Sequence, residues 1–210
     1  MSERIDVAGR PDASDVWPRR RLYPLARVLT EVLSPFTVVA ALLTVVALLT
    51  DPCWVRSAVI TAVPIAVVPQ GISLYLTHRG MVSDKFIRHR RQRHLYYALT
   101  LGSVLIGTVL VFVIPTSMEL RVVSALSVGT LLAVMAINTR IKISIHALIA
   151  AVAAVVLPAM LSSWVVLLLA VLGWAGVAWS RVYLDRHQIS DVVLGSLLGG
   201  LVGVLFLVLV

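Results

Sequence analysis

The chain has 210 residues, of which 60% are hydrophobic and 13% are charged. An ordinary soluble domain is about 45–50% apolar and about 25% charged. This composition therefore excludes a soluble enzyme and a disordered regulator, and the single cysteine excludes a disulfide scaffold. The net charge of +8 would indicate a nucleic-acid partner in a soluble protein. With a mean hydropathy of +0.98, we predict instead an all-α polytopic membrane bundle that binds no nucleic acid.

Continuous apolar runs long enough to cross a bilayer recur along the chain. A hydrocarbon core of about 30 Å needs about 20 apolar residues in a helix. Strands are not expected, because the runs do not alternate and an isolated strand leaves its backbone unsatisfied in lipid. The predicted spans, in chain order, are residues 27–50, 57–77, 95–114, 122–138, 145–161, 164–179 and 192–210.

Two of these segments leave the number of spans at six or seven. The fifth is near the lower length limit, and the first carries Arg27 and Glu31 ahead of its apolar half, which favours the interface for that part. In the seventh segment, Gly195, Gly199 and Gly203 recur every four residues on one face. Such a stripe predicts a helix–helix seam within the bundle.

The connections between the spans sort into two sides of the membrane. One side holds the N-terminal tail and the segments 78–94, 139–144 and 180–191, and with Arg27 counted in the tail it carries sixteen of the eighteen basic residues. Only Arg56 and Arg121 fall on the other side. Because basic connections are retained in the cytoplasm, we expect the first side to be cytoplasmic. Residues 1–26 would form a basic tail before a single membrane domain over 27–210.

The strongest of three polar clusters on this side runs from Ser180 to Asp191. Ionisable groups at the ends of membrane helices are costly and mark function. His187 and Asp191 are four residues apart, so on a helix they share a face. The carboxylate can fix the imidazole tautomer and make its second nitrogen a nucleophile. Arg181 offers a planar fork that matches phosphate oxygens.

The second cluster, residues 142–146, begins the fifth predicted span. Ser144 can donate a hydrogen bond to an anion beside the free N–H groups of the helix end, and His146 can give a proton to a leaving alkoxide. Taken alone, either histidine is as simply explained by a bond to a neighbouring carbonyl. Two such histidines facing one basic connection favour a phosphate site.

The third cluster, residues 84–94, is strongly basic, and its candidate phosphate ligands are Lys85, Arg90 and Arg93. Taken alone, this segment is more simply a binder of anionic headgroups or a topology signal. No cysteine or histidine spacing is typical of a metal site, and acidic residues are few. We therefore expect a phosphate site without a metal ion or another cofactor.

The third motif of a known family is present in this arrangement. The sequence resembles the type 2 phosphatidic acid phosphatase superfamily, membrane lipid-phosphate phosphatases related to vanadium haloperoxidases, over about residues 80–205. The family motif Ser-Arg-x5-His-x3-Asp is matched in full by Ser180, Arg181, His187 and Asp191.

The two other family motifs are matched only in part. For Pro-Ser-Gly-His the sequence offers Ser144 and His146, with isoleucine at both remaining positions. For Lys-x6-Arg-Pro it has Arg93 followed by histidine, and Lys85 lies one residue early. These departures leave the first phosphate-binding motif degenerate.

The resemblance implies a mechanism. His187 would attack phosphorus and form a phosphohistidine, Asp191 would orient it, and His146 would protonate the leaving lipid oxygen. The phosphoryl oxygens would be held by Arg181, Ser144, Arg93, Arg90 and Lys85. Guanidinium groups would take the place of a metal ion, since phosphoryl transfer depends mostly on positioning and charge stabilisation.

A site at membrane helix ends predicts an amphiphilic substrate. Candidates are polyprenyl phosphates or diphosphates, phosphatidic acid, phosphatidylglycerol phosphate and polyprenyl-phosphoryl sugars with a terminal phosphate. The expected cytoplasmic side, in a bacterial plasma membrane, favours a biosynthetic enzyme acting on a polyprenyl-phosphoryl phosphoribose or a prenyl diphosphate. Two alternatives stay open, an inactive lipid-binding or transport protein and a lipid phosphotransferase. The sequence predicts no oligomeric state.

Overall fold

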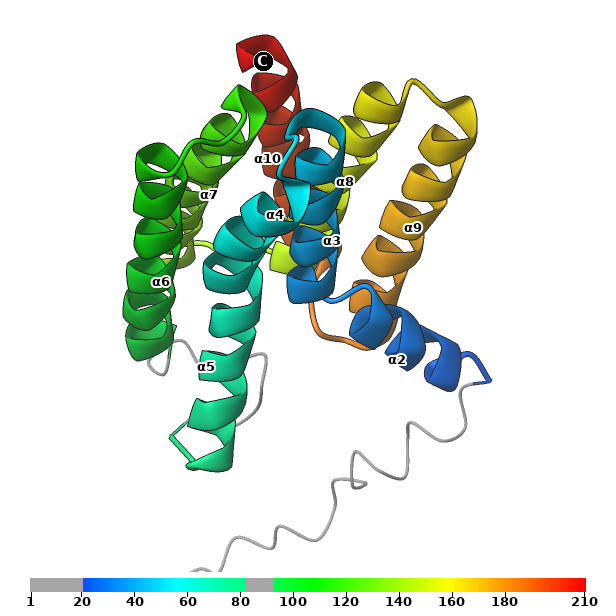
Figure 1. Cartoon of the computed structure of the whole chain (residues 1–210). Coiled ribbons are helices and arrows are strands. Elements are labelled where there is room, and N and C mark those ends of the chain that lie inside the picture. The colour runs from blue at the N-terminus through cyan, green and yellow to red at the C-terminus, as the bar shows by residue number, and fades with distance from the viewer. Residues whose placement is uncertain (1–20, 82–92) are drawn as a thin grey trace, which may run out of the picture.

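The computed structural model describes residues 21–81 and 93–210, where every regular element is a helix (Figure 1). In lipid, a chain must satisfy its N–H and C=O groups internally. The elements are α2 (Tyr23–Val32), α3 (Pro35–Thr50), α4 (Trp54–Ala62), the π-helical turn η1 (Val63–Val67), α5 (Val68–His78), α6 (Arg93–Val113), α7 (Met118–Asn138), α8 (Ile145–Leu161), α9 (Trp164–Tyr183) and α10 (Ile189–Leu209). The all-α membrane bundle is confirmed.

Five helices of the described residues are long and apolar enough to cross a membrane, with α4, η1 and α5 taken together. The bent pair α2 and α3 brings that number to six. α8 has 17 residues and is shorter, yet it carries the chain back to the end of the bundle where α9 begins (Figure 1). All seven predicted segments are therefore present as helices.

The first predicted span is two helices rather than one. α2 and α3 meet at an angle of 44°. Ser34 caps α3, since its side chain accepts a hydrogen bond from the N–H of Thr37, and Pro35 takes the first helical position. A cap followed by proline starts a new helix, so the chain bends where the composition alone indicated a continuous run.

The second predicted span, Trp54–His78, contains a π-helical turn in its middle. Pro69 has no N–H to donate, which in the register of that turn leaves the carbonyl of Pro64 available. Ser103 of α6 donates to this carbonyl at 2.6 Å. Gly107 faces the same point, where a Cβ would lie 2.6 Å from Pro64 Cγ. The kinked helix can therefore approach α6 closely.

The glycine stripe of α10 packs against α8. A Cβ at Gly195 would overlap the carbonyl oxygen of Ser144, and one at Gly199 would overlap that of Leu148. At Gly203 it would lie 2.8 Å from a valine of α8. The predicted helix–helix seam within the bundle is confirmed, and its backbones approach too closely for any side chain larger than hydrogen.

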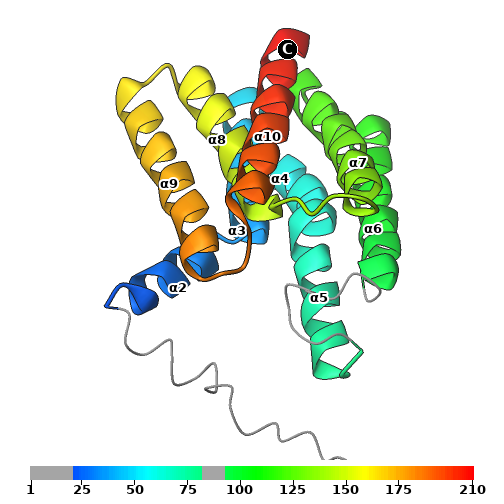
Figure 2. The ribbon, with the colours of Figure 1, turned by 180° about the vertical axis from the view of Figure 1, so that it is seen from behind.

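The two ends of the bundle differ in their polar chemistry. We call the end with the connections 139–144 and 184–188 the motif end, and the end with residue 210 the opposite end (Figures 1 and 2). Arg140, Lys142 and Arg186 lie in described connections of the motif end, whereas Arg56 and Arg121 lie in the first turns of α4 and α7 at the opposite end. This distribution agrees with the predicted two-sided topology.

A buried carboxylate joins two connections at the opposite end. Asp51 Oδ1 accepts a hydrogen bond from the N–H of Cys53 at 2.7 Å. Its Oδ2 accepts from Ser57 Oγ at 2.9 Å and from the N–H of Ser117 at 3.2 Å. Burial raises the pKa of Asp51, but these hydrogen bonds and the charge of Arg56 outweigh burial and hold the pKa below its ordinary value of 3.8.

Replacing Asp51 by asparagine is expected to lower the free energy of unfolding by about 1–3 kcal/mol, because the amide would turn an N–H group toward one of the donors. Thermal unfolding in detergent micelles measures this, with Asp185→Asn as the control at an exposed carboxylate. The carboxylate stabilises the fold above pH 3.8, and this contribution is lost as the pH falls through the lowered pKa. Equal melting temperatures for wild type and Asp51→Asn at neutral pH would contradict the assignment.

Candidate active site

The connections that carry the second and third motifs meet at the motif end. Figure 2 shows the α9–α10 connection beside the start of α8. A backbone hydrogen bond joins the two, since the N–H of Ser144 donates to the carbonyl of Asp191 at 3.0 Å. This bond fixes two segments that are far apart in the sequence against each other.

The turn after α9 positions His187. The N–H of Arg186 donates to the carbonyl of Arg181 at 3.0 Å, and the N–H of Asp185 donates to that of Val182 at 3.0 Å. Asp185 has a φ of +50°, and together these features form a Schellman motif. The N–H of His187 also donates to the carbonyl of Arg181, at 3.2 Å. The chain therefore folds back so that His187 returns to the end of α9.

His187 and Asp191 form the predicted pair, but His187 precedes α10, so the turn after α9 brings the two together and not a shared helix face. His187 Nδ1 lies 3.1 Å from Asp191 Oδ2, and both side chains are about nine-tenths buried. The same oxygen accepts a hydrogen bond from the N–H of Gln188 at 3.2 Å, within a capping box that starts α10. Because the carboxylate engages Nδ1, the lone pair for chemistry lies on Nε2.

Arg181 occupies the last turn of α9 and is only 4% exposed. Its positive charge acts on His187, and a cation there also complements the carbonyl end of the helix. The preceding Ser180 is fully buried, lies 2.9 Å from the hydroxyl of Thr30 in α2 and donates to the carbonyl of Val177. Ser180 therefore holds α2 against α9, while Arg181 faces the site.

Lys142 belongs to this site, although the sequence analysis placed it in the second cluster without giving it a role. Its Nζ donates to the carbonyl of Arg186 at 2.9 Å and lies 3.9 Å from Asp191 Oδ2. The side chain is half exposed. Its place two residues before Ser144 was the only available signal, because the bond to the α9–α10 connection depends on tertiary packing.

Ser144 and His146 lie at the first turn of α8. The hydroxyl of Ser144 accepts a hydrogen bond from the N–H of Ala147 at 3.4 Å and caps the helix. Ser144 is fully buried and His146 is 5% exposed. Gly195 lets α10 approach this turn. The first turn of α8 is thus held beside Asp191 at the start of α10.

The surroundings of His187 favour a neutral imidazole. Burial lowers its pKa, and the charges of Arg181 and Lys142 lower it further, while the bond to Asp191 opposes them. The net effect lowers the pKa of His187 from 6.5 to about 4. A neutral imidazole oriented by a carboxylate and placed beside a buried guanidinium can attack an electrophile that carries negative charge.

The remaining candidate phosphate ligands are not brought into the site by any described contact. Lys85 and Arg90 lie outside the described residues. Arg93 is the first residue of α6, at the motif end, and the structure describes its backbone alone. For these three residues, phosphate binding stays a prediction.

The sequence model of the PAP2 superfamily matches residues 88–210, more than half of the chain. The chain belongs to the PAP2 superfamily. The match includes the motif residues of α8, α9 and α10, and the predicted family is confirmed. Comparison with curated proteins found no match, and neither did comparison with solved structures.

Family membership and the apolar helices indicate a multi-pass membrane phosphatase of the PAP2 type. The phosphate chemistry inferred from His187, Asp191 and Arg181 agrees with this family.

Proposed function

We propose that the protein hydrolyses a phosphomonoester or diphosphate of a membrane lipid, with His187 as the nucleophile. The observation that carries this proposal is the 3.1 Å contact of His187 Nδ1 with Asp191 Oδ2, beside the buried Arg181. It supports an imidazole with a fixed tautomer, a depressed pKa and an anion-binding neighbour. These are the properties of an activated nitrogen nucleophile.

The reaction proceeds in two steps. Nε2 of His187 forms a bond to phosphorus while the bond between phosphorus and the lipid oxygen breaks, and that oxygen takes a proton from His146. A water molecule then gives its proton to His146 and attacks phosphorus, and the bond to Nε2 breaks to release phosphate. Asp191 keeps the proton of Nδ1 in place throughout and stabilises the charge that develops on the ring.

Charge stabilisation of the phosphoryl group comes from cations and hydrogen-bond donors, with no metal ion needed. We assign this role to Arg181 and Ser144, together with Arg93, Arg90 and Lys85 of the basic segment. Such groups act most strongly where water is excluded. The burial of Arg181 and Ser144 supports their assignment.

The proposal is tested by phosphate release from detergent-purified protein with EDTA present throughout. The panel contains prenyl phosphate, prenyl diphosphate, phosphatidic acid and a polyprenyl-phosphoryl phosphoribose. We expect release from at least one lipid and, after rapid quenching with labelled substrate, a phosphoenzyme that is labile to acid and stable to base, as a P–N bond is. No release from any lipid would favour an inactive lipid-binding protein. Transfer of label to an added alcohol in place of water would indicate a phosphotransferase.

The pH dependence provides a test of the electrostatics around His187. Since the nucleophile must be neutral, the acid limb of kcat/KM should lie near the lowered pKa of about 4. Lys142→Gln removes a positive charge that lowers this pKa, so its acid limb should move to higher pH. Arg140→Gln, an exposed charge on the same connection, is the control. Titration of the substrate affects wild type and both variants equally, so it cannot cause a difference between them. If the acid limbs of all three proteins coincide, His187 is not the group that titrates there.

The acid role of His146 predicts a dependence on the leaving group. His146→Ala should lower kcat more for an alkyl phosphate, whose alkoxide needs a proton, than for an activated aryl phosphate. We would compare ethyl phosphate with 4-nitrophenyl phosphate. An equal loss for both substrates would show that His146 does not act as the acid.

We further propose that the site faces the cytoplasm of a bacterial cell and serves lipid biosynthesis, with a polyprenyl-phosphoryl phosphoribose or a prenyl diphosphate as substrate. The support is the concentration of basic residues at the motif end. A reporter enzyme that works only in the cytoplasm should be active when it is fused to the N-terminus. Activity of a reporter that requires export would place the site outside.

A further inference from the structure

The serine of the third motif takes no part in the proposed chemistry, and its hydroxyl is engaged elsewhere. Ser180 is fully buried, and its hydroxyl donates to the carbonyl of Val177 at 2.8 Å. The Oγ1 atom of Thr30 lies 2.9 Å from Ser180 Oγ. A serine hydroxyl has a single proton to donate, so Thr30 is the donor in this contact. Thr30 is also buried, and the pair is therefore shielded from competing water.

α9, the helix that carries Arg181, lies at the edge of the bundle (Figures 1 and 2). It is the least buried of the five candidate spans that the structure describes. Its buried residues are Val177, Ser180 and Arg181, all within its last two turns. Midway along the helix, Trp174 Nε1 donates to the hydroxyl of Ser196 in α10 at 3.0 Å. The turn with Arg181 lies beyond that bond, so its position depends on the neighbours that bury it.

One of these neighbours is α2, which lies at the motif end beside the last turns of α9 (Figures 1 and 2). Its own buried residues are Ala26 and Thr30. A Cβ at Gly176 would lie 3.6 Å from a methyl group of Leu29. Gly176 and Ser180 are four residues apart and share the face of α9 that α2 contacts. The family match begins at residue 88, so a helix outside the matched residues supports the turn that carries the motif.

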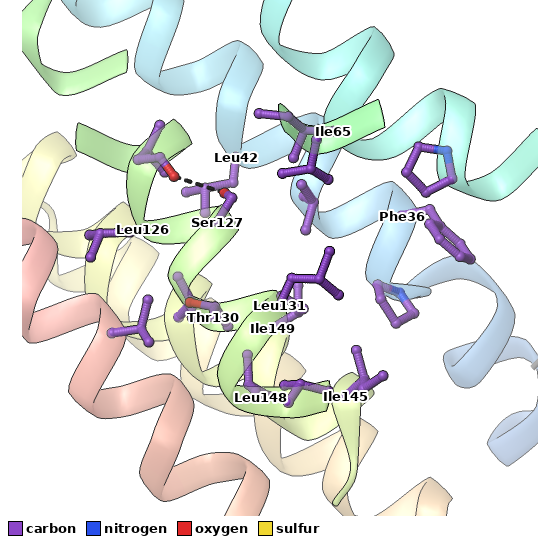
Figure 3. Close-up of a pocket in the computed structure, with 18 of the residues that line it drawn as sticks. Phe36, Leu42, Ile65, Leu126, Ser127, Thr130, Leu131, Ile145, Leu148 and Ile149 are labelled. Carbon is purple, nitrogen blue, oxygen red and sulfur yellow. Dashed lines mark hydrogen bonds between the residues drawn. The ribbon is translucent and has the colours of Figure 1, made fainter. Parts of the chain in front are cut away.

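The next helix along the chain, α3, borders an apolar cavity at this end of the bundle (Figure 3). The cavity has a volume of about 170 Å³, and its walls include Phe36 of α3 and Ile145 of α8. Figure 3 shows Phe36 across the space from Leu131 and Ile149. None of the motif residues is part of these walls. The side-chain contact with a motif residue comes from α2 instead.

We propose that Thr30 is a positioning residue for phosphate binding, which acts through Ser180 on the position of Arg181. The inference rests on the proposed function and adds a requirement of the same site. Without the hydroxyl of Thr30, the last turn of α9 can shift and carry the guanidinium group away from the phosphoryl oxygens. Arginine binds phosphate through a planar fork, which depends on geometry as well as on charge. A small shift of the turn therefore lowers the affinity for phosphate.

The experiment measures the Kd of inorganic phosphate by isothermal titration calorimetry, with the full chain in detergent micelles. Thr30→Val removes the hydroxyl and keeps the shape of the side chain, whereas Thr30→Ser keeps the hydroxyl. Thr44→Val is the matched control, because the hydroxyl of Thr44 donates to the Ala40 carbonyl of its own helix. Thr30→Val should raise the Kd by about three- to tenfold, the factor that corresponds to one hydrogen bond. Thr30→Ser and Thr44→Val should bind phosphate as wild type does.

A double-mutant cycle tests the route through Ser180. Ser180→Ala should weaken phosphate binding about as much as Thr30→Val, and the double variant should bind no more weakly than either. The melting temperatures of the same proteins show that each is folded. A contact that only stabilises the fold would lower the melting temperature of Thr30→Val and leave its Kd unchanged, which would overturn the inference. Additive losses in the double variant would overturn the route through Ser180.

The outcomes separate this inference from the proposed function. If wild type binds phosphate but releases none from any lipid of the panel, the proposed function fails, while the Kd values still decide the role of Thr30. If wild type hydrolyses a lipid, Thr30→Val should raise the KM for it and Thr44→Val should not. A wild-type protein that binds no inorganic phosphate would overturn the positioning role.

Discussion

His187→Ala is expected to lower phosphate release from every substrate by at least about 10³-fold, because loss of a nucleophile removes the covalent route altogether. The fold should survive, since the turn around His187 is held by backbone hydrogen bonds to Arg181 that alanine retains. The measurement is the rate of phosphate release at saturating substrate, with the melting temperature as a check on folding.

The matched control is His78→Ala, an exposed histidine at the end of α5, which should leave the rate unchanged. A second variant, His187→Gly, opens a space that free imidazole can enter, and added imidazole should restore part of the rate. A positioning role alone would not give this rescue. Near wild-type release by His187→Ala would move the nucleophile to another residue.

Gly199→Ala is expected to cause the largest loss of stability of any single methyl group added to α10. The new Cβ would overlap the carbonyl oxygen of Leu148, which is backbone and cannot rotate away. Overpacking of this kind costs up to about 3 kcal/mol, which corresponds to about 6–12 °C in melting temperature for a chain of this length. Thermal unfolding in detergent measures the shift.

Gly200→Ala is the control, because a Cβ at Gly200 meets no atom within 4 Å. The two positions are adjacent on one helix, so helix propensity is nearly matched, and the variants differ in that only Gly199 faces α8. The control should melt at or slightly above the wild-type temperature, since alanine favours a helix over glycine by about 1 kcal/mol. Similar melting temperatures for the two variants would show that α8 and α10 are packed less closely than the structure has them.

Several features were accessible from the sequence because they depend on neighbours along the chain. Helices follow from apolar runs in lipid, and the glycine seam follows from a spacing of four. The pair of His187 and Asp191 was also predicted from that spacing, but His187 precedes α10 and reaches Asp191 through the turn after α9. The break at Ser34 and Pro35 is equally local, and the cap followed by proline was the signal for it. The break was missed because the composition was averaged over the whole predicted span.

The rest depends on how helices distant in the sequence pack. The contact of Lys142 with Asp191 arises because α8 and α10 pack closely along the glycine seam. This packing brings the connection before α8 next to the connection before α10. The cavity beside Ile145 collects walls from helices spread over most of the chain. The sequence by itself determined the helices, the two-sided charge and the family, because each is encoded in local spacing and composition. Only the tertiary structure decided which cations reach the carboxylate, because those distances are set by side-chain packing between helices.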